Sequence, residues 1–552
     1  MTRARWWLLL GGLLVAAVLL RAALLLAAPD QLHDGGDGAS GRVYHEELLR
    51  GVAARDIAEG SLLPWTGWQV NDFWGGSLVV SLLAAPLYQL FGDHLLCLRA
   101  VGVLFQLLLA VFAWCWLSER ASRVAATVAT LLIVAPPWGY LASSLMVYGT
   151  HLELCALQVL VAWTHLRGGG GRLGWIAKGA LAGFATWFGY STVVVLGCVV
   201  VAAALDRVRP TRDWMLRALL PWAAGALVGL APLFLRLAYS GGVVGVYDGG
   251  LLHHLERGLL HGTPRGLDGA VVHGPLEKWL LLWSGELAQA AFLPWWGGVA
   301  LVLLVLASAL SNISDRSTAE TARGRWSEPG RFALLAAFAW TVSYAVSDFG
   351  LGTRAWVFDW RYLMPLWPWG AIILAVACSR WLASPRALPR WSGVALLCLP
   401  PCFALHAGMQ LAPERRAASI AAPGSDDRVL ERFLALQITA NPDTLSLSVA
   451  ALQSLGQRAE RSEAEYDRSR ALAESLARGI AWVASAPIPE GLENRVEAED
   501  RKDRSREALR QLTEGPARPF QWTFGDAWGR LHESSSEGRV GPDGAPGVES
   551  GK

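Results

Sequence analysis

Long blocks of apolar residues from Trp6 to Ala412 restrict what this chain can fold into. Several blocks reach about 20 residues, the length that an α-helix needs to cross the hydrocarbon core of a bilayer. Only 17% of the residues are charged and the mean hydropathy is +0.33, whereas about 25% of the residues of a soluble domain are charged. We therefore predict an all-α polytopic membrane protein, and we exclude a soluble enzyme for most of the chain.

The composition changes near Pro413, and we divide the chain there. Residues 1–412 are predicted to form a transmembrane domain, and residues 413–552 a polar, mostly helical tail. Helical periodicity in the tail covers about 426–436, 445–480 and 492–513. The Gly- and Ser-rich end after Ser534 is expected to be frayed.

We predict about eleven transmembrane helices with interfacial helices in the first outer loop. The apolar stretch Gly179–Leu205 lies between two Arg-rich loops that should both be cytoplasmic. It must therefore cross the membrane outward and return, so we predict two short helices with a break near Gly189. The block Phe73–Phe91 contains Pro86 and is expected to lie at the interface, because a crossing there would move every later Arg-rich loop outside. The expected spans are 6–28, 95–117, 124–142, 147–165, two short helices within 179–205, 216–238, 292–310, 331–347, 362–382 and 391–411.

The distribution of Lys and Arg sets the predicted sidedness. Loops placed inside hold 18 of these residues and loops placed outside hold about 7, as expected when basic residues near helix ends stay in the cytoplasm. The amino terminus is then cytoplasmic, and the acidic first loop and the tail are extracytoplasmic. Arg outnumbers Lys 44 to 4, which indicates a GC-rich, bacterial coding sequence and places the protein in the bacterial cytoplasmic (inner) membrane.

Acidic residues crowd into the first outer loop, between Pro29 and Asp72. A short amphipathic helix is expected to begin near Glu46 and Glu47, where the helix dipole favours anions. Asp34 and Asp37 precede it in the same loop. These carboxylates are candidates for general acid–base chemistry, and the alternative is a solvated or capping acidic turn.

Two further clusters combine polar residues with membrane depth. His151 and Glu153 stand where one span turns into the next, and an ionisable group such as Glu153 inside the membrane is a candidate site residue. The alternative is a glutamate that snorkels to the surface. Later in the chain, Arg361 and Tyr362 enter the membrane from the outer face; an arginine there can bind a phosphate with a forked contact, or it can anchor the aromatic belt.

The sequence gives little indication of disulfides, metal sites or nucleic-acid binding. The seven cysteines all lie in apolar blocks without a CxxC pair, which is typical of small buried hydrophobes. Four histidines, His253, His254, His261 and His273, share one outer loop without the spacing of a metal site. No metal site or certain cofactor is predicted, and a divalent cation is left open. The net charge of +2 gives no indication of nucleic-acid binding.

The motifs together resemble the GT-C class of membrane glycosyltransferases, the group of protein O-mannosyltransferases and lipid A aminoarabinose transferases. Glu46 stands 14 positions before Gly60, although the family usually has Asp where this chain has His45. An Arg opens the next span after an apolar interfacial block, as in the family. The remaining matches are Leu63-Pro64-Trp65, Ala135-Pro136-Pro137, the sequence YGTHLE from Tyr148 and the sequence RYLMPLWP from Arg361.

The resemblance implies transfer of a sugar from a polyprenyl-phosphate carrier to a lipid, glycan or protein acceptor on the outer face. It implies a catalytic base at Glu46, with Glu47, Asp34 and Asp37 as substitutes. It also implies a substrate-binding group, which we take as Arg361, Tyr362, His151, Glu153 and His45. Two alternatives stay open, a lipid or solute transporter (flippase) and a non-catalytic membrane scaffold.

The predicted sidedness can be tested by cysteine labelling, because the native cysteines lie in apolar blocks. Single cysteines replacing Ser425 and Ala39 should react with an impermeant reagent in intact cells, while one replacing Ser317 should not. The reverse pattern would make Phe73–Phe91 a true span and would put the Arg361 motif and the first-loop acids on opposite faces.

Overall fold

The computed structural model forms two compact units, Met1–Leu32 with Arg42–Ala422, and His33–Gly41 with Pro423–Lys552. Each unit is considered by itself. The structure describes residues 2–27, 45–58, 60, 75–92, 95–167, 170–206, 215–239, 263–265, 271–282, 304–308, 328–347, 363–403, 405, 480, 483, 484 and 495–514.

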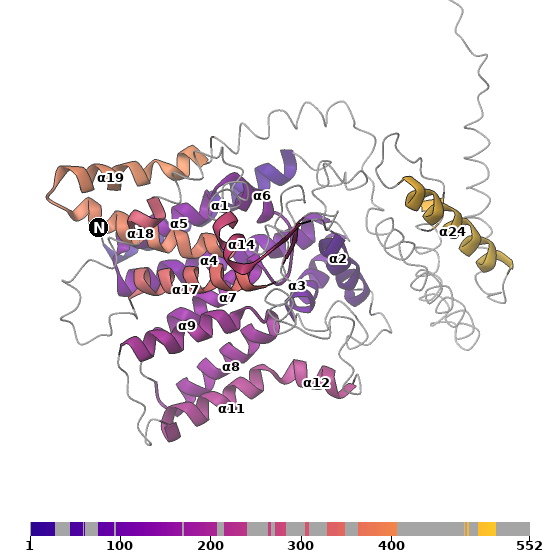
Figure 1. Ribbon diagram of the computed structural model, residues 1–552, viewed down its shortest axis with the longest axis horizontal. Helices are drawn as coiled ribbons and strands as arrows, with labels where there is room; N and C mark the ends of the chain where they lie inside the picture. Colours follow the sequence, from indigo (N-terminus) through magenta and orange to yellow (C-terminus); the bar gives the residue numbers. More distant parts are fainter. Residues whose placement is uncertain are drawn as a thin grey trace, which may run out of the picture. The chain divides into compact units, whose positions relative to one another are not determined.

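Helices make up nearly all of the described part of the first unit (Figure 1). They are α1 (Arg3–Ala27), α2 (His45–Ala58), α3 (Gly75–Phe91), α4 (Leu95–Arg120), α5 (Arg123–Val134), α6 (Trp138–Ser143), α7 (Leu152–Leu166), α8 (Arg172–Phe188), α9 (Thr192–Leu205), the π-helical turn η4 (Met215–Leu219), α11 (Leu220–Gly229), α12 (Ala231–Tyr239), α14 (Pro275–Leu281), α17 (Pro329–Val346), α18 (Leu366–Ala383) and α19 (Ala387–Leu397).

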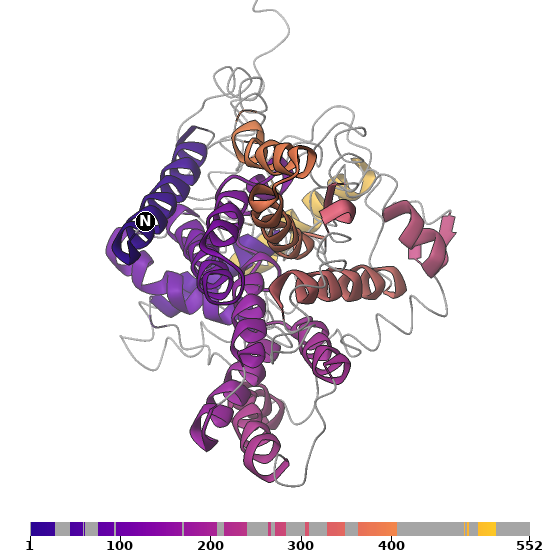
Figure 2. The same cartoon turned by 90° about the vertical axis from the view of Figure 1, so that its left-hand side faces the viewer.

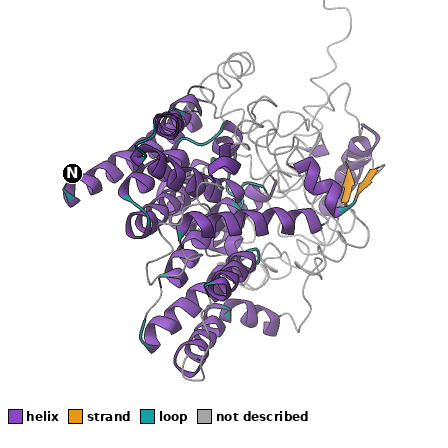
Figure 3. Cartoon of the chain, turned by 60° about the vertical axis from the view of Figure 1, so that its left-hand side comes forward, coloured by secondary structure: helices purple, strands orange, loops and turns teal. Residues whose placement is uncertain are grey.

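One short antiparallel ribbon accompanies the helices of the described part. Strands β1 (Thr263–Arg265) and β2 (Val271–His273) pair with Thr263 opposite His273, and they are drawn in orange in Figure 3. β-branched residues such as Val271 and Val272 favour extended backbone. The ribbon belongs to the His-rich loop, which apolar periodicity alone could not resolve.

Three of the described helices are long and apolar enough to cross a membrane. Their apolar stretches are Ala4–Leu25 in α1, Leu95–Arg120 in α4 and Leu366–Ala383 in α18. Several shorter apolar helices accompany them in the described residues. The structure is therefore that of a helical membrane protein, and the count of eleven spans stays a prediction.

The predicted spans 124–142 and 147–165 are wrong at their adjoining ends. Helix α5 stops at Val134, because Pro136 and Pro137 bring no N–H groups to continue it. Helix α7 begins only at Leu152. Between them lies a largely buried stretch that contains the short helix α6, which we call the 135–151 segment.

The predicted break within Gly179–Leu205 is present. Helix α8 ends at Phe188 and α9 begins at Thr192, whose hydroxyl donates a 2.8 Å hydrogen bond back to the carbonyl of Ala185. On its other side α8 packs tightly against α11 (Figure 2). A Cβ added to Gly179 would overlap the carbonyl oxygen of Trp222, so the two backbones touch there.

Aromatic rings and small residues fill the core between α4, α5, α7, α17 and α18. Phe332 of α17 packs edge-on against Trp116 of α4 and Trp369 of α18, at centroid distances of 5.9 and 6.0 Å. Large exposed apolar side chains cover the outer faces of α1, α3, α4, α9 and α11. Such extensive exposed apolar surface suits contact with lipid tails.

Several contacts bring the basic helix termini together at one end of the first unit, which we call the basic end. Arg123, at the start of α5, lies over the ring of Trp6 near the start of α1. Arg120, at the end of α4, donates a 2.9 Å hydrogen bond to the carbonyl of Leu166 at the end of α7. Arg380, at the end of α18, pairs with Glu328 just before α17.

Helix α3 does not run between the two ends of the unit. A Cβ on Gly76, at the start of α3, would overlap the carbonyl of Gly149, which precedes the start of α7 at Leu152 and so lies at the end of α7 away from the basic end. The other terminus of α3, Phe91, is only four residues from Leu95, where α4 starts, also away from the basic end. Both termini of α3 thus lie away from the basic end, as expected for an interfacial helix.

The described part of the second unit contains α24 (Arg495–Glu514), at the third of the predicted tail helices. Its exposed side chains form ion pairs at i,i+3 and i,i+4 spacing, such as Asp500 with Arg504 at 3.1 Å, and Leu509 is buried. The other two predicted tail helices lie outside the described residues.

Candidate functional site

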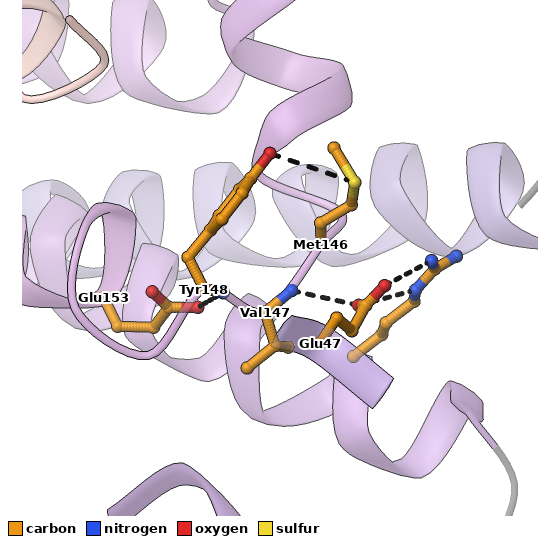
Figure 4. Close-up of polar contacts among 6 residues, drawn as sticks. Glu47, Met146, Val147, Tyr148 and Glu153 are labelled. Atoms are coloured by element: carbon orange, nitrogen blue, oxygen red, sulfur yellow. Dashed lines mark hydrogen bonds and ion pairs between the residues drawn. The ribbon is translucent and has the colours of Figure 1, made fainter. Parts of the chain in front are cut away.

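A buried ion pair fixes α2 to the start of α4. Glu47 and Arg99 are 0% and 1% exposed, and the guanidinium donates to both carboxylate oxygens, Nε to Oε1 at 3.0 Å and Nη2 to Oε2 at 2.8 Å. The backbone N–H of Val147 donates a further 3.0 Å bond to Oε1 (Figure 4). Glu47 therefore joins three parts of the chain that are far apart in sequence.

Arg50, one helical turn after Glu47, makes a second connection. Its Nε donates a 3.1 Å bond to the hydroxyl of Ser77, and its carbonyl accepts a 2.9 Å bond from Ser81. Both serines belong to α3, so α2 and α3 are held side by side. A Cβ on Gly149 would lie 2.8 Å from Arg50 Nε, and Gly149 has φ +77°. Both the close contact and the left-handed backbone conformation therefore favour glycine at this position.

Glu153 lies in the first turn of α7 and is 1% exposed. Its Oε1 accepts a 3.0 Å bond from the backbone N–H of Tyr148, and the other oxygen points away from that bond (Figure 4). Within the described residues, Oε2 has no hydrogen-bond partner. Leaving a buried polar atom unpaired costs about 1–3 kcal/mol, and more for a charged group. Arg50 attracts this carboxylate electrostatically.

The 135–151 segment also meets the start of α18. Tyr140, Met146 and Tyr148 cluster with Met364, and the ring centroids of Tyr140 and Trp367 are 6.4 Å apart. Met364 and Trp367 belong to the RYLMPLWP sequence. The segment is thus the meeting point of three motifs that the sequence separates by up to about 300 positions.

The predicted site residues have different outcomes. Glu47, His151 and Glu153 come together around the 135–151 segment, where the His151 ring lies 5.9 Å from that of Tyr148. His45 and Glu46 lie in the first turn of α2, as predicted, but their side chains are outside the described part. Asp34, Asp37, Arg361 and Tyr362 lie outside the described residues altogether.

Sequence reasoning assigned no role to three buried cations. Arg21, within α1, donates to the carbonyls of Val134 and Ile133 at 3.2 and 3.4 Å, and so caps the C-terminus of α5. Arg50 was counted only as a loop charge. Lys278 of α14 donates a 3.0 Å bond to the carbonyl of Ser347 at the end of α17. The available signal was a basic residue inside or beside an apolar block.

In the described part of the chain, no three His, Cys, Asp or Glu side chains lie close enough together to hold a metal ion. His273 is in β2, and the other three histidines of its loop fall outside the described ranges.

Comparison with known proteins returned neither a matching family model nor a matching curated sequence. Among solved structures, the chain is similar to ArnT from Cupriavidus metallidurans bound to undecaprenyl phosphate, with a TM-score of 0.48 and 14% identity over 98% of this chain and 82% of ArnT. It is also similar to the archaeal oligosaccharyltransferase AglB from Archaeoglobus fulgidus in complex with an inhibitory peptide and a dolichol-phosphate, with a TM-score of 0.44 and 14% identity.

The AglB match covers 81% of this chain and 59% of AglB. ArnT and AglB are glycosyltransferases of the GT-C class, the class that the sequence motifs resemble.

The ion pair between Glu47 and Arg99 predicts a strong coupling in stability. Glu47→Gln or Arg99→Gln alone should lower the free energy of unfolding by about 3–5 kcal/mol, because each leaves a buried charge unpaired. The double variant should lose much less than the sum of the two. Thermal unfolding of the purified protein in detergent measures all three losses.

Arg167→Gln is the matched control for that experiment. Arg167 pairs with Glu119 at 3.2 Å but is 60% exposed, so its loss should cost at most about 1 kcal/mol. Additive losses of stability for the Glu47 and Arg99 variants would contradict a direct interaction between the two side chains. We call this ion pair the clamp.

Proposed function

We propose that the protein transfers a sugar from a polyprenyl-phosphate carrier to an acceptor at the outer face of the membrane. One observation carries the proposal: the acidic helix after α1, the YGTHLE turn and the described residues 363–368 of the RYLMPLWP sequence converge on the 135–151 segment, away from the basic end. In the resemblance these are the motifs that bind donor and acceptor. A shared active site requires these motifs to lie at the same end of the first unit.

The chemistry needs few groups. An inverting transfer requires a carboxylate to receive the proton of the acceptor hydroxyl while the new glycosidic bond forms. It also requires cationic groups to stabilise the departing phosphate. In our proposal Glu46 takes the proton or orients the acceptor, Arg361 holds the phosphate, and the lipid tail lies in a groove between helices.

The proposal is tested with the full-length protein reconstituted in vesicles. The probes are synthetic undecaprenyl-phosphate donors carrying a hexose, a pentose or an N-acetylhexosamine, with a bacterial envelope extract as the acceptor source. Release of undecaprenyl phosphate together with labelled product, followed by mass spectrometry, supports the proposal. If no donor is consumed, the transferase assignment fails.

Glu46→Gln should lower the turnover number by about 10²-fold or more, the usual scale for losing a general base. The purified variant and wild type are compared at saturating donor, and equal binding of undecaprenyl phosphate serves as the control for folding. Unchanged turnover would move the role to another carboxylate of the first loop, Asp34 or Asp37.

Arg361→Ala should raise the KM for the lipid donor more than the KM for the acceptor, because it removes the forked contact with the carrier phosphate. An arginine that only anchors the aromatic belt predicts less protein in the membrane but normal kinetics per molecule. Steady-state kinetics and protein content measured on the same preparation separate these outcomes.

The broken helix α5 favours one alternative. Transporters place discontinuous helices at their binding sites, and α5 ends inside the bundle with its last carbonyls capped by Arg21. A carrier would move a fluorescent polyprenyl-phosphate lipid between the leaflets of the same vesicles without consuming it. Leaflet exchange without donor consumption would favour this function over transfer.

A further inference from the structure

Glu153 differs from Glu47 in what its carboxylate oxygens contact. In Glu47, Oε1 accepts bonds from Arg99 and Val147 and Oε2 accepts a bond from Arg99. Both oxygens of that carboxylate are held by donors of the protein, and the side chain is 0% exposed. Glu47 therefore positions α2 and is unsuited to receive a proton.

In Glu153, by contrast, one oxygen is held and one is open. Oε1 accepts the N–H of Tyr148, whereas Oε2 is buried and has no hydrogen-bond partner among the described residues. Buried polar atoms in proteins are nearly always paired, so an unpaired one needs an explanation in function or in an unseen partner. The orientation of Glu153 is fixed while its second oxygen stays available.

Glu153 combines burial with a nearby positive charge. Its side chain is 1% exposed, and Arg50 attracts its carboxylate. The position in the first turn of α7 places the carboxylate at the end of the helix where the dipole favours anions.

We propose that Glu153 receives the proton that the acceptor hydroxyl loses during sugar transfer, and that Glu46 orients the acceptor. The inference rests on the proposed function and deepens it. In this step the acceptor O–H bond breaks, its proton passes to a bridging water molecule, and that water gives one of its own protons to Glu153 Oε2. The acceptor oxygen forms a bond to the anomeric carbon, and the bond from that carbon to the phosphate oxygen breaks, its electron pair leaving with the polyprenyl phosphate.

The burial of Glu153 determines how the proton arrives. A side chain that is 1% exposed is not reached by a bulky acceptor, but a base can act through one water molecule. Thr150, in the same turn, also buries an Oγ1 atom that has no hydrogen-bond partner in the described structure. A buried water needs polar partners, and this turn supplies them.

The test uses the reconstituted full-length protein and the undecaprenyl-phosphate donor that wild type consumes. The wild-type turnover number should fall toward low pH, because a carboxyl that is already protonated cannot accept a proton. Glu153→Gln should lower turnover by about 10²-fold or more. It should also abolish the fall in turnover toward low pH, which is the acidic limb of the pH–rate profile. Glu46→Gln should also lower turnover but keep the limb, because the proton acceptor is still present.

A spectroscopic readout separates a proton acceptor from a structural residue. During a single turnover, the infrared difference spectrum of wild type should gain a protonated-carboxyl band that Glu153→Gln lacks. Glu119→Gln is the matched control, since Glu119 lies at the basic end, paired with Arg120 and Arg167. That variant should keep the band, the limb and the turnover.

Folding is checked by thermal unfolding and by binding of undecaprenyl phosphate alone. If Glu153→Gln does not fold, Glu153→Asp takes its place and should keep the limb at reduced turnover. Normal turnover and a normal limb in Glu153→Gln, or a limb lost in a folded Glu153→Asp, would overturn this inference alone. A wild-type protein that consumes no donor would overturn the proposed function as well.

Discussion

The ion pair between Glu47 and Arg99 is the interaction on which the rest of the site depends. It is fully removed from water, so each partner is needed to make the burial of the other tolerable. Through Val147 the same carboxylate also fixes the 135–151 segment. This clamp thus ties the first turn of α2 to the turn before α7 and to the start of α4.

The 135–151 segment explains why so many polar groups are buried in one region. Backbone without regular helical bonds is tolerated at membrane depth only when its N–H and C=O groups find partners within the protein. Glu47 and Glu153 accept the N–H groups of Val147 and Tyr148, and Arg21 meets the carbonyls that α5 leaves open. An irregular turn is thereby held rigidly among helices, as a site that must orient two substrates requires.

Charged residues have different roles at the two ends of the first unit. At the basic end, Arg120, Arg123 and Arg380 tie helix termini together. At the other end, two carboxylates of the same type have unlike surroundings, since both oxygens of Glu47 accept bonds while one oxygen of Glu153 has no partner among the residues that the structure describes. Environment rather than residue type assigns a positioning role to one and leaves the other available for proton transfer.

The sequence by itself determined the helical membrane class, the break near Gly189 and the helix that begins at the first-loop acids, because apolar length, basic loops and helical periodicity are local properties. It also singled out Glu47, His151 and Glu153. It could not determine that Arg99 is the partner of Glu47 or that Val147 donates to the same carboxylate. Nor could it show that Glu153 keeps one carboxylate oxygen without a hydrogen-bond partner among the described residues. The first two contacts join residues 52 and 100 positions apart, and only the tertiary structure brings such residues within hydrogen-bonding distance.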